Sequence, residues 1–126
     1  MAYRLEREKT DLTPYVLIDE ERGYMRLEGE SYHENIFEFF SEIKEWLCKY
    51  LSTDFDNFTV DIELKYFNSS TVKLLIGMLR DMDSSKNVKN ITVNWITTVS
   101  NIIIIECGER FQKGLKNLNL VMMIND

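Results

Sequence analysis

The sequence predicts an α/β fold in the order ββαβαβαβ, with helices packed on a mixed, mostly parallel sheet. Two observations support this: short β-prone runs alternate with segments of helical period, and strands that alternate with helices are joined by right-handed crossovers into parallel sheets. The 126 residues, 44% of them hydrophobic, suffice for one domain with its own apolar core. We therefore expect residues 1–126 to form a single domain.

The expected elements follow one another without repeats or low-complexity segments. Residues 1–13 are charged and aperiodic, which predicts a loose lead-in ending at Thr13-Pro14. A hairpin comes next, because two β-prone runs flank Glu20–Gly23, where glycine permits positive φ. The expected elements are strands 15–19 and 24–28, a helix over 36–51, a strand over 58–66, a helix through 72–82, a strand over 88–95, a helix over 101–115 and a strand over 118–124.

Two of these helices leave alternatives open. In the first, either Ser31 with Glu34 or Asn35 with Glu38 supplies the capping pair, so its start varies by about one turn. In residues 101–115, four consecutive isoleucines favour a strand, whereas the apolar residues further along keep a helical spacing. We predict a helix for that segment.

The net charge of −6 and the pI near 4.9 make nucleic acid and anionic membranes unfavourable partners. No apolar run is long enough to span a membrane, and the first residues mix charges where a signal peptide needs an apolar core. We therefore expect a cytoplasmic protein without membrane insertion. Cys48 and Cys107 lack CxxC spacing and are expected to be free, reduced thiols.

Catalysis finds little support in the sequence. It holds one histidine, no glycine-rich phosphate loop and no GxSxG or HExxH motif, so we expect no enzyme, no cofactor and no metal site. His33 beside Glu30 or Glu34 is the only acid–base candidate, and an exposed loop histidine explains it more simply. A small enzyme that uses His33 is therefore an alternative function that ranks behind the two binding functions described below.

The expected topology brings three loops to one end of the sheet. If the strands run parallel, segments 29–35, 68–71 and 97–101 all follow carboxyl ends of strands, where α/β proteins place their sites. In the second segment a helix begins with three hydroxyls, those of residues 69–71. A helix N-terminus stabilises an added phosphate by roughly 0.3–1 kcal/mol. The alternative is that Asn68 is an N-cap and the hydroxyls only satisfy helix-end donors.

Four motifs indicate a family and, together with shorter matches at Lys9-Thr10, Thr13-Pro14, Phe39-Phe40 and Trp46-Leu47, cover nearly the whole chain. The four motifs are Leu-Glu-Gly-Glu-Ser-Tyr-His-Glu-Asn at 27–35, Tyr-Phe-Asn-Ser-Ser at 66–70, Val-Asn-Trp at 93–95 and Gly-Glu-Arg-Phe at 108–111. They resemble the SiaC-type bacterial regulatory phosphoproteins. The resemblance implies a fold similar to STAS domains, the fold of anti-sigma-factor antagonists. It also implies a partner-switching adaptor served by a cognate Ser/Thr kinase, a PP2C-like phosphatase and an effector such as a diguanylate cyclase.

By motif matching, the phosphate acceptor is Ser69, with Ser70 and Thr71 as alternatives. The phosphate would act on partner binding through its charge. The residues expected to form the docking face are Glu30, Ser31, Tyr32, His33, Glu34, Asn35, Tyr66 and Asn68. A constitutive interaction scaffold of the same fold, without phosphorylation control, is the alternative function.

The chain departs from the family pattern in three places. Relatives usually have threonine in place of Ser69 and proline in place of His33, and an acidic stretch where this chain has the uncharged residues 96–105. In a helix, four consecutive isoleucines span more than one face, so some must meet a partner, another protomer or solvent. We expect Ile102 and Ile103 to belong to a self-association or effector surface, and hence a homo-oligomer as an option.

Overall fold

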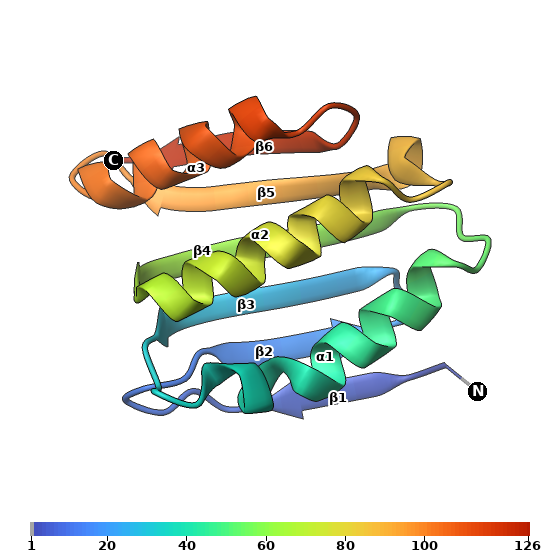
Figure 1. Cartoon of the computed structure of the whole chain (residues 1–126), viewed down its shortest axis with the longest axis horizontal. Coiled ribbons are helices and arrows are strands. Elements are labelled where there is room, and N and C mark those ends of the chain that lie inside the picture. The colour runs from blue at the N-terminus through green and yellow to red at the C-terminus, as the bar shows by residue number, and fades with distance from the viewer. Residues whose placement is uncertain (1) are drawn as a thin grey trace.

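One six-stranded sheet frames the molecule; the structure, a computed structural model, describes residues 2–126 (Figure 1). The strands are β1 (Arg4–Arg7), β2 (Tyr15–Asp19), β3 (Tyr24–Ser31), β4 (Phe58–Phe67), β5 (Ile91–Thr98) and β6 (Asn119–Asn125). The helices are α1 (Ile36–Leu51), α2 (Ser69–Asp83) and α3 (Ile102–Gly114), with a 3-10 turn, η1, at Val88–Asn90. The strands lie in chain order, β1–β3 antiparallel and β3–β6 parallel, which confirms the predicted α/β class and mixed sheet.

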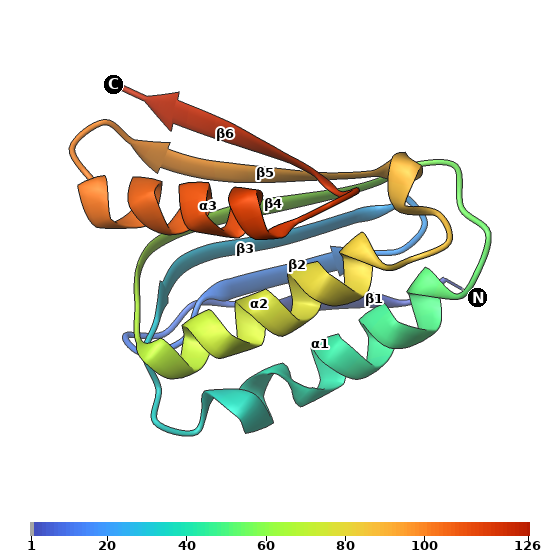
Figure 2. The same ribbon diagram turned by 45° about the horizontal axis from the view of Figure 1, so that its top comes forward.

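All three helices lie on one face of the sheet (Figure 2). Each connection after β3 moves one strand further in the same direction, and right-handed crossovers then place every helix on the same side. The covered face is apolar: along β4, for example, Phe58, Val60 and Ile62 are buried at alternate positions. Among residues 2–126, no helix is long and apolar enough to cross a membrane.

The opposite face of the sheet is uncovered and polar at its centre. Arg26 forms ion pairs with Glu28, Asp61 and Glu63 at 2.9, 3.4 and 2.5 Å. The Tyr24 hydroxyl donates to Asp61 at 2.7 Å. This network balances the carboxylates along the solvent-facing side of β3 and β4.

β1 corrects the prediction of a loose lead-in over residues 1–13, of which Met1 lies outside the described residues. Arg4–Arg7 pairs antiparallel with β2, and Arg7 reaches across to α1, donating to the Phe39 carbonyl and pairing with Glu42. The two contacts of Arg7 with α1 join residues more than thirty positions apart in the chain. Because three of the four strand residues are charged, local pattern alone does not indicate the strand.

The helix boundaries resolve the alternatives left open by the sequence. α1 begins at Ile36 with Asn35 as its N-cap residue, and the Asn35 amide donates to Glu38. The second of the two predicted starts is therefore correct, and Ser31 belongs to β3. The isoleucine segment is helical, as predicted, and the residues before Ile91 form a 3-10 turn rather than the start of β5.

Gly108 permits the close approach of α3 to the sheet. The buried Trp95 indole donates its Nε1–H to the Ile104 carbonyl at 2.9 Å and lies edge-to-face against Phe111. A Cβ atom on Gly108 would lie 2.5 Å from both Cδ1 and Nε1 of Trp95. Only glycine therefore lets this helix settle over the indole.

Gly108→Ala is expected to destabilise the protein by roughly 1–3 kcal/mol, because the methyl group overpacks the Trp95 site. Urea unfolding followed by tryptophan fluorescence measures this loss. Gly77→Ala in α2 is the matched control: apart from its chain neighbours and the backbone of its own helix, no atom lies within 4 Å of its Cβ position, so we expect a gain of up to about 1 kcal/mol from helix propensity. Equal stability of Gly108→Ala and the native chain would contradict this packing account.

Candidate functional site

The three loops expected at one end of the sheet do meet there. Asn68, between β4 and α2, donates its backbone N–H to the Ser31 carbonyl at the end of β3 at 3.2 Å. Asn101, before α3, donates its side-chain amide to the Lys65 carbonyl at 3.0 Å. The parallel arrangement of β3, β4 and β5 thus brings segments 29–35, 68–71 and 97–101 to one end of the sheet, at the carboxyl ends of these strands.

A buried hydroxyl cluster joins two of these loops. The Thr71 Oγ1 atom lies 2.9 Å from both the Ser31 carbonyl oxygen and the Ser31 hydroxyl, and 3.1 Å from Asn68 Oδ1. Asn68 also caps α2 by accepting the Thr71 N–H at 3.0 Å. Both hydroxyl residues are fully buried. They therefore hold the loops together, and the roles predicted for them, docking for Ser31 and an alternative acceptor for Thr71, do not fit their burial.

The three hydroxyls at the start of α2 differ in accessibility. Ser69 is exposed, Ser70 is half-buried and Thr71 is buried. Ser69 is the first residue of the helix, where unpaired backbone N–H groups and the positive end of the dipole favour negative charge. Lys73, also exposed, follows at the i+4 position on the same helix face. An anion on Ser69 would therefore meet a favourable electrostatic environment.

The loop before α1 lies beside the start of α2. Tyr32 and Tyr66 form an edge-to-face pair with ring centroids 5.3 Å apart, and Tyr66 is 54% exposed. The Leu12 carbonyl accepts the backbone N–H groups of Tyr32 and His33 at 3.0 and 3.1 Å. His33 Nδ1 in turn accepts the Asn35 N–H at 3.0 Å, which braces the loop.

The remaining predicted docking residues lie at the same end of the sheet. Glu30, Glu34 and Asn35 are exposed, while His33 and Asn68 are half-buried. Among residues 2–126, no group of three or more His, Cys, Asp and Glu side chains could hold a metal ion. The Nδ1 atom of His33 accepts a hydrogen bond from the Asn35 backbone and not from Glu30 or Glu34.

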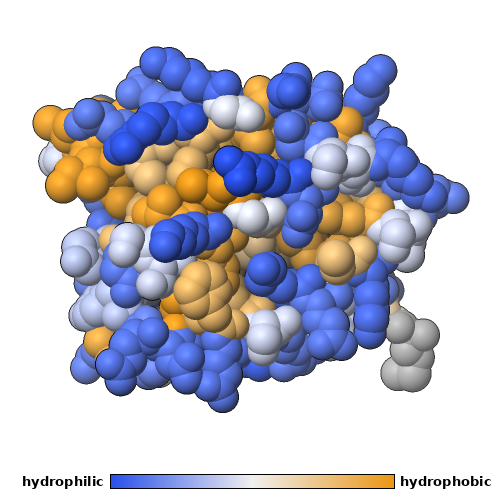
Figure 3. All heavy atoms as spheres, viewed as in Figure 1, coloured by the Kyte–Doolittle hydropathy of each residue, from blue (hydrophilic) through white to orange (hydrophobic). Residues whose placement is uncertain are grey.

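An apolar groove between α2 and α3 was not predicted from the sequence. Its volume is about 340 Å³. Its lining residues are Val72, Ile76, Leu79, Arg80, Cys107, Arg110, Phe111, Gly114 and Leu115. Figure 3 shows hydrophobic surface in this region, interrupted by strongly hydrophilic side chains. The wide apolar stripe of α2 indicates that this helix has apolar surface beyond its sheet contact, but the stripe does not locate the groove.

The groove continues from the Ser69 position. Ser69, Val72 and Ile76 follow the i, i+3, i+7 spacing of one helix face. Arg80 and Arg110 place two positive charges in the groove of a chain whose net charge is −6. A ligand that offers both apolar side chains and carboxylates therefore suits it.

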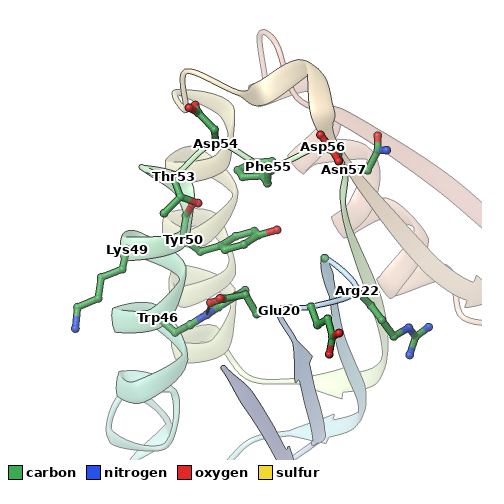
Figure 4. A pocket seen from close by; sticks show the side chains of 12 residues that line it. Glu20, Arg22, Trp46, Lys49, Tyr50, Thr53, Asp54, Phe55, Asp56 and Asn57 are labelled. Atoms are coloured by element: carbon green, nitrogen blue, oxygen red, sulfur yellow. Dashed lines mark hydrogen bonds between the residues drawn. The ribbon is translucent and has the colours of Figure 1, made fainter. Parts of the chain in front are cut away.

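A second cavity, of about 730 Å³, lies at the other end of the sheet (Figure 4). It is lined in part by Gly23 and Asn57, which precede β3 and β4, so it is remote from the carboxyl-end loops. Its aromatic wall is a continuous stack, with Trp46 and Phe55 each 4.8 Å from Tyr50 between ring centroids. Burial raises the pKa of the Tyr50 hydroxyl, which keeps it neutral. This wall closes the core beneath it.

Comparison with known proteins gives a consistent result. The model of the "SiaC family regulatory phosphoprotein" family matches residues 7–124. An uncharacterized protein of Pseudomonas aeruginosa strain UCBPP-PA14 is 25% identical over 105 residues, covering 82% of this chain and 83% of that protein. The crystal structure of apo-SiaC from P. aeruginosa superposes with a TM-score of 0.87 at 22% identity, covering 96% of this chain and 98% of that one.

A further solved structure contains a partner. In the crystal structure of the diguanylate cyclase SiaD in complex with its activator SiaC from P. aeruginosa, the matched chain has a TM-score of 0.87 at 22% identity, with 95% of this chain and 98% of that chain covered. These structural likenesses establish the shared fold. Because the family model spans nearly the whole sequence, this chain belongs to the SiaC family of regulatory phosphoproteins.

Proposed function

We propose that this chain is a non-enzymatic adaptor that binds a diguanylate cyclase and is switched by phosphorylation of Ser69. A cognate Ser/Thr kinase adds the phosphate and a PP2C-like phosphatase removes it. The observation that supports this most is the exposure of Ser69 at the first position of α2, while the Thr71 hydroxyl is buried. The P. aeruginosa activator that shares this fold is itself bound to a diguanylate cyclase.

The docking face in this proposal combines the surface around Ser69, at the carboxyl end of the sheet, with the groove between α2 and α3. The occupant is a cyclase segment, an amphipathic helix with apolar side chains for Val72 and Ile76 and carboxylates for the two groove arginines. Charge complementarity supports it, since Arg80 and Arg110 attract carboxylates. The same end of the sheet also carries exposed Tyr66 and the loop residues Glu30, His33, Glu34 and Asn35.

The phosphate acts as a switch through charge. It adds nearly two negative charges one helical turn before Val72, on the same face as the groove. There it repels a carboxylate-bearing segment that would otherwise bind along this helix face. The unphosphorylated chain is therefore the binding form, and the helix start tolerates the modification because the dipole favours it.

Titration of the diguanylate cyclase from the same host tests this function. We expect the unphosphorylated chain to bind and the kinase-treated chain to bind at least about tenfold more weakly, which corresponds to about 1.4 kcal/mol. Phosphatase treatment of the second sample is the control and restores binding. Equal affinities of the two forms would support the constitutive scaffold instead.

A further inference from the structure

β6 is an edge strand whose outer backbone groups have no strand partner. It pairs with β5 alone and forms the last strand of the sheet (Figures 1 and 2). The Asn125 carbonyl accepts the Val99 N–H at 2.8 Å, so Asn125 and the residues that alternate with it face the β5 side. The backbone groups of Leu120, Met122 and Ile124 therefore point outward. The Leu120 carbonyl accepts one hydrogen bond from the Gln112 side chain at 2.9 Å, consistent with this orientation. A carbonyl oxygen has two lone pairs, so it can accept a second bond from a partner strand.

This edge lacks the protection that the other edge has. At β1, three of the four residues in Arg4–Arg7 are charged, which discourages pairing with another strand. From Leu118 to Asn125 there is neither a charge nor a proline, although 29% of the chain is charged. A long, uncharged edge strand is a template for a further strand.

The sequence of β6 is complementary to itself. Asn-Leu-Val-Met-Met-Ile-Asn reads as a chemical palindrome about Met122. In an antiparallel pair related by a twofold axis at Met122, Leu120 lies opposite Ile124 and Asn119 opposite Asn125. The residues whose backbone N–H and C=O groups point outward, Leu120, Met122 and Ile124, then lie opposite one another in the two copies. Such residues form the hydrogen-bonded pairs of an antiparallel ladder. The register that matches the side chains also matches the backbone.

The surface beside the edge is apolar and uncharged. Met123 and Ile124 are 44% and 43% exposed. The neighbouring turn and helix start add Val99, Ile102 and Ile103, of which Ile103 is 76% exposed. Figure 3 shows hydrophobic side chains gathered at the start of α3. Two copies with a net charge of −6 each repel one another, and a charge-free contact surface minimises that cost.

We propose that β6 binds β6 of a second copy of this chain, antiparallel and in the register centred on Met122, which joins two sheets into one. The strand's match to itself selects a second copy over an unrelated protein, because an isologous contact needs only one self-complementary element. The proposal is independent of phosphorylation at Ser69, which lies on α2 rather than at this edge.

Light scattering of the full unphosphorylated chain over a range of concentrations tests the dimer. We expect twice the 15.0 kDa chain mass, and a dimer about tenfold weaker or more for the double variant Met123→Lys, Ile124→Lys. Phe37→Lys is the control: Phe37 is 50% exposed on α1, away from this edge, and its replacement leaves the dimer unchanged. A monomer at every concentration, or a dimer indifferent to the two lysines, would overturn the proposal.

Cysteine cross-linking tests the register with chains that remain folded. In a Cys48→Ser background, a mixture of Val121→Cys and Met123→Cys chains is expected to form covalent dimers under mild oxidation. Each variant alone forms them much more slowly, because residue 121 lies opposite residue 123 of the other copy. Equal cross-linking of the separate variants and the mixture would refute the Met122-centred register.

Discussion

Ser69→Ala is expected to abolish phosphate incorporation by the cognate kinase, whereas Ser70→Ala leaves most of it. The kinase must reach the hydroxyl, and among the three candidates only Ser69 is exposed. Radiolabelled phosphate transfer with the host kinase measures the difference. The fold should remain intact in Ser69→Ala, because the cap of α2 is the Asn68 side chain and not the Ser69 hydroxyl.

The control for this experiment is Thr71→Val, which removes a buried hydroxyl of the Ser31 cluster. It is expected to lower stability by about 1–3 kcal/mol, because the Ser31 carbonyl and the Asn68 amide lose a partner, without removing the acceptor. Full phosphate incorporation in Ser69→Ala would contradict the assignment and move it to Ser70.

Arg110→Glu is expected to weaken cyclase binding by about tenfold or more, because it reverses a charge inside the proposed docking groove. Arg110 is an exposed side chain, so the substitution should leave stability nearly unchanged. Isothermal titration of the unphosphorylated variant with the host cyclase measures the effect.

Lys113→Glu provides the matched control for Arg110→Glu. It lies on the same helix, is exposed and changes the net charge equally, but Lys113 does not line the groove. We expect its affinity to remain within about threefold of the native value. If both variants bind equally weakly, overall charge rather than the groove controls the interaction.

The sheet and its helices were largely predictable, because burial imposes periodicity on the sequence. The alternation along β4 and the apolar stripe of α1 each arise from one face packing on the core. β1 was not predictable in this way. Its Leu5 packs against the core among charged neighbours, and the ion pair that supports it, between Arg7 and Glu42, joins residues distant in the chain.

The candidate site was predictable in its location and not in its detail. Parallel strands necessarily bring the loops after β3, β4 and β5 to the same end of the sheet, so the proximity of Ser31 and Asn68 followed from topology. The depth of each hydroxyl did not, because residues 69–71 are adjacent serines and a threonine whose exposure depends on helix phase. The groove required the relative placement of α2 and α3, which no local pattern encodes.

Phosphopeptide mapping of the chain isolated from its own host, with and without phosphatase treatment, tests the central claim most directly. The account predicts a phosphate on Ser69 that the phosphatase removes, in the fraction of the protein that does not copurify with the cyclase. A Ser69 peptide that stays unmodified across several growth conditions, while the chain still binds the cyclase, would contradict it and leave a binding module without this switch.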